Sequence, residues 1–370
     1  MPIGWGIVGF GWVAESYMAP AIRDAGHRLV AISDPDPAAQ DRAAALGVAI
    51  GVDADALAAD PAVEAVYVAT PNHLHRPAVE AAARAGKPVL CEKPMAATLA
   101  DALALANAVR RAGILYGTAF DQRHHPAHRA MRAAVAGGRI GTPTAVRIVY
   151  GCWVGRDWAD AGGRENWRID AAKAGGGALI DLAPHGLDLV EFLLGEPIVD
   201  VAALLQSRVQ DYGPDDGAVL VGRTRSGVLA SLHVAYNYPE ALPRRRLEVS
   251  GSGGLLVAID TMGQEAGGSV TLTDARTGLA SPLPISDAAA SPFTNQVAAF
   301  ADAMRSPGAS GFSLERDLHT MRLIDAAYGG APQTIAAVSS FRGRGSGTRN
   351  PCPGTADPVG SGFRAAPAPE

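Results

Sequence analysis

A glycine pattern near the N-terminus has the spacing of a dinucleotide-binding turn. The pattern GxGxxG/A is filled by Gly9, Gly11 and Ala14. The first glycine permits a tight turn, the second lets the backbone approach a pyrophosphate, and the third small residue lets the helix pack on the strand. The amides of Trp12 and Val13 would then meet the pyrophosphate at the positive end of the helix. The chemistry indicated is the binding of a dinucleotide cofactor.

An aspartate follows this pattern at the offset expected for a ribose contact. Asp34 lies 23 residues after Gly11, at the end of a second apolar run. A carboxylate at this place would bond the adenosine ribose hydroxyls and repel a 2′-phosphate. The next residues are Pro35, Asp36 and Pro37, with no arginine or lysine. We therefore predict NAD in preference to NADP; a turn aspartate before a proline is the structural alternative.

A second dense stretch holds an acid and an imidazole. Asp181 and His185 are four residues apart and follow the run Gly175–Gly177, so they share a face if the stretch is helical. Pro184 is tolerated in a first helical turn, which predicts that the helix starts close to it. The alternatives to acid–base chemistry are an N-cap aspartate beside an unrelated core histidine, or half of a metal site. No third ligand stands at a metal-like spacing, so we predict no metal.

One lysine stands at the end of an apolar run in the stretch VLCEKPMAAT. Lys93 follows Glu92 and precedes Pro94, which disfavours helical backbone at the residue before it. If the apolar run is a strand of a parallel sheet, Lys93 lies at the carboxyl end, where such sheets bind ligands. A solvated loop charge is the plain alternative.

The elements that must position these residues fall into two regions. Over the first 120 residues, short apolar runs alternate with alanine-rich helical stretches, which predicts a doubly wound parallel sheet. The predicted strands are Gly4–Val8, Leu29–Ser33, Ala65–Thr70, Pro88–Cys91 and Ile114–Thr118, with helices at Arg76–Ala85 and Leu99–Ala112. Beyond residue 122, strand-like segments predict an α+β region with a mostly antiparallel sheet. Its predicted helices are Arg129–Ala136, Leu182–Leu194, Thr294–Met304 and Leu314–Tyr328.

Composition narrows the class of protein further. The chain has 370 residues, 48% of them hydrophobic, and a net charge of −5, which argues against nucleic-acid binding. No apolar run has the length of a membrane helix, and the N-terminus lacks the pattern of a signal peptide. The three cysteines, Cys91, Cys152 and Cys352, are far apart and form no CxxC pair. This usage fits a reducing cytoplasm, where we expect the protein to reside.

Three parts of the chain are expected on these grounds. Residues 1–122 form the Rossmann NAD-binding domain, and residues 123–330 form the second, α+β domain. Residues 331–370 are predicted to be a disordered tail, because the last 30 residues contain 11 glycines or prolines and few large apolar groups.

These motifs together resemble those of the glucose–fructose oxidoreductase / inositol dehydrogenase / MocA (Gfo/Idh/MocA) family. The residues that carry the resemblance are Gly9-Phe10-Gly11, Thr70 to His75, Glu92-Lys93-Pro94, Arg123, Trp167-Arg168 and Gly175 to His185. The similarity extends in order over roughly residues 3–328. It implies a Rossmann domain followed by a domain with an open, largely antiparallel sheet. Since that sheet often forms the oligomer interface in the family, it also implies a homodimer or homotetramer.

The resemblance also implies roles for individual residues. In the family the lysine lies beside the nicotinamide ribose and the reacting hydroxyl, so Lys93 would stabilise alkoxide character. His185 would act as general base, with an unperturbed pKa near working pH. Asp181 would orient the substrate and the imidazole, and could share the role of base. The implied cofactor contacts are Gly9, Phe10, Gly11, Trp12, Val13, Asp34, Thr70, Asn72, His75, Glu92 and Lys93, and the further substrate contacts are Arg123, Trp167 and Arg168.

The predicted function is an NAD-dependent dehydrogenase that acts on a small polyhydroxylated substrate: a sugar, a nucleotide sugar or a cyclitol. One alternative is a glycosidase that uses tightly held NAD for transient oxidation, and another is a non-catalytic NAD-binding regulator. The combination of Lys93, Asp181 and His185 argues against the regulator, because a sensor needs no general base.

Two further clusters have competing interpretations. His124, His125 and His128 are spaced like metal ligands, but we favour a capping or solvated role. The run Arg244–Arg246 is interpreted as a loop or strand-edge cluster, with contact to a substrate phosphate as the alternative.

Overall fold

Six parallel strands form the sheet of the N-terminal part of the chain, in the order β3-β2-β1-β4-β5-β6. The computed structural model describes residues 1–51, 53–158, 166–306 and 311–329. The strands are β1 Gly4–Val8, β2 Arg28–Ser33, β3 Ala49–Gly51, β4 Ala65–Val68, β5 Val89–Cys91 and β6 Tyr116–Thr118. The order reverses at β1 and β4, the switch point at which doubly wound sheets bind ligands. The predicted Rossmann sheet is thus confirmed.

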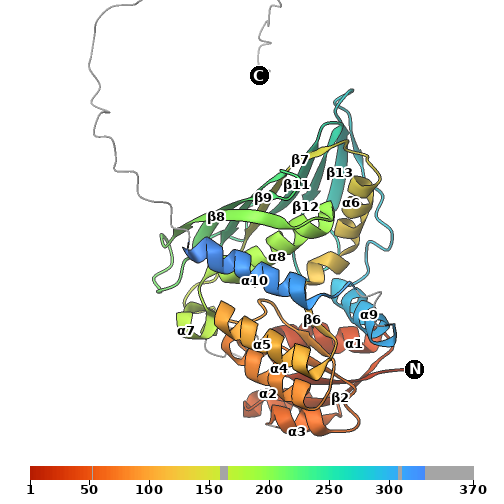
Figure 1. The fold of residues 1–370 in the computed structure, drawn as a ribbon, viewed down its shortest axis with the longest axis vertical. Coiled ribbons are helices and arrows are strands. Elements are labelled where there is room, and N and C mark those ends of the chain that lie inside the picture. The colour runs from red at the N-terminus through yellow and green to blue at the C-terminus, as the bar shows by residue number, and fades with distance from the viewer. Residues whose placement is uncertain (52, 159–165, 307–310, 330–370) are drawn as a thin grey trace, which may run out of the picture. The chain divides into compact units, whose positions relative to one another are not determined.

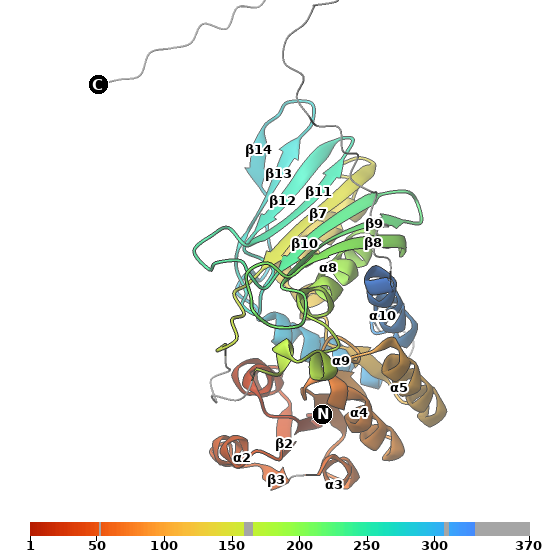
Figure 2. The same cartoon turned by 90° about the vertical axis from the view of Figure 1, so that its left-hand side faces the viewer.

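The helices of this region flank the parallel sheet (Figures 1 and 2). They are η1 Ala14–Met18, α1 Ala19–Asp24, α2 Pro37–Ala44, α3 Ala54–Ala59, η2 Asn72–Leu74, α4 His75–Arg84 and α5 Leu99–Ala112. The sequence analysis located α4 and α5 but missed α2, β3 and α3. All three residues of β3 are exposed at the sheet edge, so this strand has no buried apolar run to reveal it.

An eight-stranded sheet dominates the rest of the chain, in the order β14-β13-β12-β11-β7-β10-β9-β8. Its strands are β7 Pro143–Gly151, β8 Ile198–Gln206, β9 Gly217–Thr224, β10 Leu229–Ala235, β11 Arg245–Gly251, β12 Gly254–Ile259, β13 Ser269–Asp274 and β14 Ala280–Pro282. Only the pair β7–β10 is parallel among these described strands, so the predicted mostly antiparallel sheet is confirmed. The helices α6 Pro126–Ala136 and α8 Ala178–Leu194 lie against one of its faces (Figure 1).

Helix α8 begins earlier than predicted. Gly177 is its N-cap, so Pro184 lies inside the helix rather than in its first turn. Two N–H groups at the start of the helix find their hydrogen-bond acceptor in a segment that is distant in the sequence. The N–H groups of Gly177 and Leu179 donate to the carboxylate of Asp215 at 2.9 Å and 2.8 Å. The start of α8 is therefore set by tertiary contacts, and Asp181 is not the N-cap.

The glycine run before α8 is required by close backbone contacts. Gly175 has φ +87°, and a Cβ atom there would lie 2.0 Å from the carbonyl oxygen of Ala97. A Cβ atom on Gly177 would lie 1.9 Å from the carbonyl oxygen of Asp215. The Gly175 contact brings the start of the helix that carries Asp181 close to the loop that follows β5, and the Gly177 contact brings it close to the segment before β9.

The last two helices pack back onto the first sheet. They are α9 Pro292–Arg305 and α10 Leu314–Gly329. Phe300 of α9 packs against Trp5 of β1 with ring centroids 5.6 Å apart. Asp317 of α10 accepts a hydrogen bond of 2.7 Å from the N–H of Thr118 in β6. Figure 1 shows α10 between α8 and α5, so the C-terminal helices connect the two sheets.

The predicted domain boundary and C-terminal tail are not tested by the described residues. The boundary between residues 122 and 123 stays a prediction, and residues 331–370 lie outside the described residues. In the part of the chain that is described, no helix is long and apolar enough to span a membrane. Cys91 and Cys152 are free thiols.

Candidate active site

A cavity of about 500 Å³ lies at the carboxyl ends of the parallel strands. One wall consists of segments that follow β1, β4, β5 and β6, and the opposite wall comes from the ends of β7 and β11 and from α8. The predicted site residues that line it are Gly11, Trp12, Val13, Thr70, Asn72, His75, Glu92, Lys93, Trp167, Arg168, Asp181 and His185. The fold therefore brings together residues that are far apart in the sequence.

The glycine turn has the shape that a dinucleotide requires. Gly9 has φ +88°, and a Cβ atom there would lie 2.7 Å from the backbone nitrogen of Thr70. The chain becomes helical directly after Gly11, so the free amides of Trp12 and Val13 belong to a first helical turn at the cavity. A positive helix end with free N–H groups suits a pyrophosphate, so these residues fit the predicted cofactor.

Asp34 braces the glycine turn. Its Oδ2 atom accepts a hydrogen bond of 2.7 Å from the N–H of Phe10, and Oδ1 accepts one of 2.9 Å from the N–H of Asp36. The side chain of Phe10 is buried in the core, so its predicted cofactor contact is limited to its backbone. A ribose contact by Asp34 stays a prediction.

Three predicted cofactor residues hold the cavity wall in place. The ring nitrogens of His75 lie 2.9 Å from the carbonyl oxygens of Pro94 and Thr70, which ties the loop after β4 to the loop after β5. The Nδ2 atom of Asn72 donates to the carbonyl oxygen of Ala174 at 2.8 Å. These contacts fix the loop that presents Lys93.

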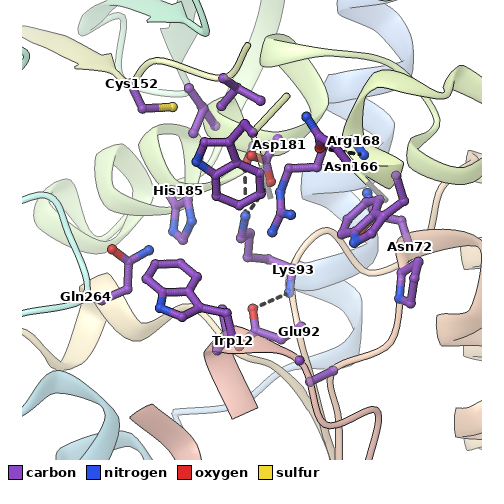
Figure 3. Close-up of a pocket in the computed structure, with 18 of the residues that line it drawn as sticks. Trp12, Asn72, Glu92, Lys93, Cys152, Asn166, Arg168, Asp181, His185 and Gln264 are labelled. Atoms are coloured by element: carbon purple, nitrogen blue, oxygen red, sulfur yellow. Dashed lines mark hydrogen bonds and ion pairs between the residues drawn. The ribbon is translucent and has the colours of Figure 1, made fainter. Parts of the chain in front are cut away.

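Lys93 and Asp181 form an ion pair in the centre of the cavity. Lys93 Nζ lies 2.6 Å from Asp181 Oδ1 (Figure 3). The hydroxyl of Tyr236 donates to Asp181 Oδ2 at 2.6 Å. Burial alone would raise the pKa of Asp181, but the charges of Lys93 and Arg168 and these hydrogen bonds hold it below its usual value. Asp181 is therefore a fixed carboxylate. Sequence reasoning missed Tyr236, since nothing in its local pattern distinguishes it from a core strand residue.

His185 lies on the same helix as Asp181, and its side chain is buried beside the ion pair (Figure 3). The edge of its ring meets the ring of Tyr150, with centroids 5.8 Å apart. Burial, reinforced by the charge of Lys93, lowers the pKa of His185 to about 3. The expectation of a pKa near working pH is thus wrong for this structure, because it took no account of burial. The imidazole is neutral at neutral pH and can accept a proton.

Two acids, Asp121 and Glu92, lie within reach of the charge of Lys93. Burial, with the nearby Glu92, raises the pKa of Asp121 to about 7. Burial also raises the pKa of Glu92, which accepts a hydrogen bond from the hydroxyl of Tyr67. Asp121 was not predicted as a site residue, although it lies in the segment that follows β6 and so had the positional signal of a residue at a carboxyl strand end.

Arg168 is held between two aromatic side chains. Its guanidinium carbon lies 4.8 Å from the ring centroid of Trp158 and 4.5 Å from that of Trp167. Arg123, in contrast, is not among the residues that line the cavity. Its Nε atom donates to both carboxylate oxygens of the buried Asp188 at 2.7 Å. The geometry gives Arg123 a structural ion pair in place of the predicted substrate contact.

The histidine cluster after β6 has structural contacts. His125 caps α6, with its Nδ1 atom accepting a hydrogen bond of 3.1 Å from the N–H of Ala127. The ring nitrogens of His128 lie 2.8 Å from the carbonyl oxygen of Gln122 and 2.9 Å from the hydroxyl of Thr261. Across the described ranges, no three histidine, cysteine, aspartate or glutamate side chains come together as a metal site.

Family models of known proteins match both the region of the parallel sheet and part of the region of the eight-stranded sheet. Residues 3–120 match the family model described as oxidoreductase family, NAD-binding Rossmann fold. Residues 128–257 match the model described as GFO/IDH/MocA C-terminal domain. The two models together cover more than half of the chain.

Individual relatives agree with the family models. A 1,5-anhydro-D-fructose reductase of Ensifer adhaerens is 36% identical over 277 residues, which are 73% of this chain and 80% of the relative. An inositol 2-dehydrogenase of Rhizobium meliloti is 32% identical, over 70% of this chain and 76% of the relative. The crystal structure of an aldose-aldose oxidoreductase from Caulobacter crescentus, complexed with glycerol, superposes with a TM-score of 0.80 at 27% identity, over 89% of this chain and 97% of that one.

Proposed function

Because the chain belongs to the Gfo/Idh/MocA family of NAD-binding oxidoreductases, we propose that it transfers a hydride between nicotinamide and a secondary hydroxyl or ketone of a sugar, nucleotide sugar or cyclitol. The observation that carries the proposal is the ion pair of Lys93 with Asp181 beside a buried neutral His185. These three residues line the same cavity as the glycine turn. A cofactor bound at the turn and a substrate bound at these residues could therefore lie in contact in that cavity.

Each residue has a separate task in this proposal. The nicotinamide of a bound cofactor supplies the hydride chemistry. The ammonium group of Lys93 stabilises the negative charge that develops on the substrate oxygen during oxidation. His185 accepts the hydroxyl proton and returns it in the reverse reaction. Asp181, held by Lys93 and Tyr236, orients the substrate hydroxyls as a fixed hydrogen-bond acceptor.

We infer a preference for NAD over NADP. The support is the carboxylate of Asp34 at the end of β2 and the absence of a basic residue among Pro35, Asp36 and Pro37. A 2′-phosphate at this position would meet a negative charge and no cation from these residues.

We also propose that the eight-stranded sheet joins two copies of the chain in a homodimer, or in a homotetramer built from it. Exposed apolar residues lie on β8, β9 and β10, namely Val199, Leu204, Leu205, Val219, Val221 and Leu229. Leu204 and Val219 are direct cross-strand partners, so they form a continuous apolar patch. Light scattering that gives a monomer mass at micromolar concentration would contradict this assembly.

The test of the proposed function follows NADH absorbance while the purified protein meets NAD and a panel of pyranoses, sugar phosphates, nucleotide sugars and inositols. Lys93→Met should bind NAD and lower kcat by about 10²–10³-fold, the range for losing one group that stabilises a developing oxyanion. The control is Lys87→Met, because Lys87 Nζ donates to the carbonyl oxygen of Val63 at 2.6 Å, outside the cavity. Unchanged turnover in Lys93→Met would refute the mechanism. Tightly retained NAD with no net NADH would favour the glycosidase alternative.

A further inference from the structure

One guanidinium group in the cavity wall has no partner among the described residues. Most other cations there are balanced: Lys93 pairs with Asp181, and Arg244 Nη1 lies 2.8 Å from Glu240 Oε1. Arg168 has two indole faces to offset its charge. Arg245 also lines the cavity, yet with the residues that the structure describes its guanidinium forms no ion pair, and its buried Nε atom has no hydrogen-bond acceptor among them.

The acids of the cavity do not compensate for this charge. Asp121 and Glu92 are the acids there that pair with no cation, and burial raises the pKa of both. The neutral form of Asp121 is well populated at pH 7, because burial raises its pKa to about 7. A partly buried guanidinium without an anion is unfavourable, so the cavity favours a ligand that brings a negative charge.

Arg245 belongs to the cavity wall that faces the Rossmann strands, near His185. Arg245 is the first residue of β11 and is paired in register with Tyr150 of β7. The ring of Tyr150 meets the ring of His185, so Arg245 lies one side chain away from the proposed base. Its guanidinium packs against Gly263, where a Cβ atom would lie 2.3 Å from Arg245 Nη1. Gln264, the next residue, lies near Trp12 and His185 (Figure 3).

The diphosphate of the cofactor has its own site at the amides of Trp12 and Val13, which follow the glycine turn. Arg245 instead stands beside the aromatic residue that contacts His185. Its charge also acts on Tyr17 of η1, whose ring centroid lies 5.3 Å from that of Trp12. Because the amides of Trp12 and Val13 already serve the diphosphate, the anion left for Arg245 is one carried by the second ligand, the molecule whose hydroxyl faces the base.

We propose that Arg245 binds a carboxylate or phosphate ester on the substrate, so that the preferred substrate is a sugar acid or sugar phosphate rather than a neutral ring. A planar guanidinium can donate to two oxygens of a carboxylate or phosphate at once. This contact would fix the orientation of the sugar ring in addition to binding it. This assignment rests on the proposed oxidoreductase function and specifies its substrate class. It changes the interpretation of the Arg244–Arg246 run, since Arg245 alone of the three lines the cavity without a partner.

The experiment compares matched substrates that differ in one group: D-glucose, D-glucuronate and D-glucose 6-phosphate, and the same three forms of galactose. For the full chain with NAD, kcat/KM should be highest for one anionic form. Arg245→Met should raise KM for that form by about 10- to 100-fold, the cost of losing charge-assisted hydrogen bonds, and leave KM for the neutral sugar unchanged. Compared with Arg245→Met, Arg245→Lys should restore part of the affinity for the anionic form, because lysine keeps the positive charge but cannot donate two parallel hydrogen bonds.

The matched control is Arg246→Met. Arg246 is the next residue, but it lies outside the cavity and its Nε atom donates to Glu248 Oε1 at 2.6 Å on the sheet surface. This variant should keep the wild-type preference between anionic and neutral sugars.

A second measurement separates this inference from the proposed function. The shift of the thermal midpoint by glucuronate or glucose 6-phosphate is measured without cofactor in the wild type, Arg245→Met and Arg246→Met. An anion-dependent shift that disappears only in Arg245→Met supports the site even if no NADH forms, in which case the oxidoreductase proposal fails. Turnover of the anionic sugars with equal KM in wild type and Arg245→Met would overturn the anion site and leave the oxidoreductase intact. Weaker NAD binding in Arg245→Met, with an unchanged substrate KM, would assign Arg245 to the cofactor and overturn the inference.

Discussion

The Nδ1 atom of His185 lies 3.6 Å from the Oδ1 atom of Asp121, and both side chains are buried. His185 Nδ1 has no hydrogen-bond partner in the described structure, so a small movement toward Asp121 would give it an acceptor. A carboxylate there would hold the Nδ1–H tautomer, leaving Nε2 to accept the substrate proton, and would stabilise the imidazolium that forms. Asp121 thus acts through His185 as a positioning residue.

Asp121→Asn should lower kcat roughly tenfold above pH 7, because the imidazolium loses its counter-charge while the base remains. The pKa of Asp121 is raised to about 7, so the carboxylate is ionised above that pH and protonated below it. Wild-type kcat should therefore rise as pH increases through about 7, whereas the variant should lack this limb and approach the wild type at lower pH. A pH profile of kcat from 5 to 9 checks this. Parallel profiles for the two proteins would contradict a role for Asp121.

Tyr236→Phe removes the donor to Asp181 Oδ2 and leaves the ion pair with Lys93 in place. The pKa of Asp181 should rise, and the loss of a hydrogen bond to a charged group should reduce kcat/KM by about tenfold or more. Tyr212→Phe is the control, since Tyr212 donates to the carbonyl oxygen of Val154 at 2.9 Å and does not line the cavity. Equal losses of kcat/KM in the two variants would indicate a general packing effect rather than orientation of Asp181.

Asp34→Asn should relax the preference for NAD, because the amide keeps the size of the side chain and removes the charge that repels a 2′-phosphate. The ratio of kcat/KM for NAD to that for NADP should fall roughly tenfold, about 1.4 kcal/mol. Asp60→Asn provides the comparison, since Asp60 precedes β4 at the amino end of the sheet, away from the cavity. Equal values of kcat/KM for NAD and NADP in the wild-type protein would contradict the proposed preference for NAD.

Asp215→Asn should destabilise the fold and the site together. An amide can accept only one of the N–H groups of Gly177 and Leu179 well, so one donor at the start of α8 loses its carboxylate acceptor. The expected loss in the free energy of unfolding is about 1–3 kcal/mol, measured by urea denaturation. Asp53→Asn changes the exposed N-cap of α3 and should cost less than about 1 kcal/mol. If the two variants were equally stable, the capping of α8 by Asp215 would contribute nothing of its own.

The sequence by itself determined the parts of this protein that depend on local pattern. The alternation of apolar runs and helical stretches determined the parallel sheet, and the glycine spacing located the dinucleotide turn within it. Lys93 was identifiable because a strand end followed by proline is a local signal. Asp181 and His185 were identifiable because four-residue spacing on a helix is local as well.

Only the tertiary structure decided which residues complete the site. Tyr236 and Asp121 approach Asp181 and His185 from the segments that follow β10 and β6, and no period in the sequence relates these segments. Distant contacts also corrected two predictions: Asp215, not Pro184, sets the start of α8, and Asp188 engages Arg123 away from the cavity. The physical reason is that capping, charge pairing and burial are properties of neighbours in space. The same burial that packs His185 lowers its pKa to about 3, which its spacing from Asp181 did not indicate.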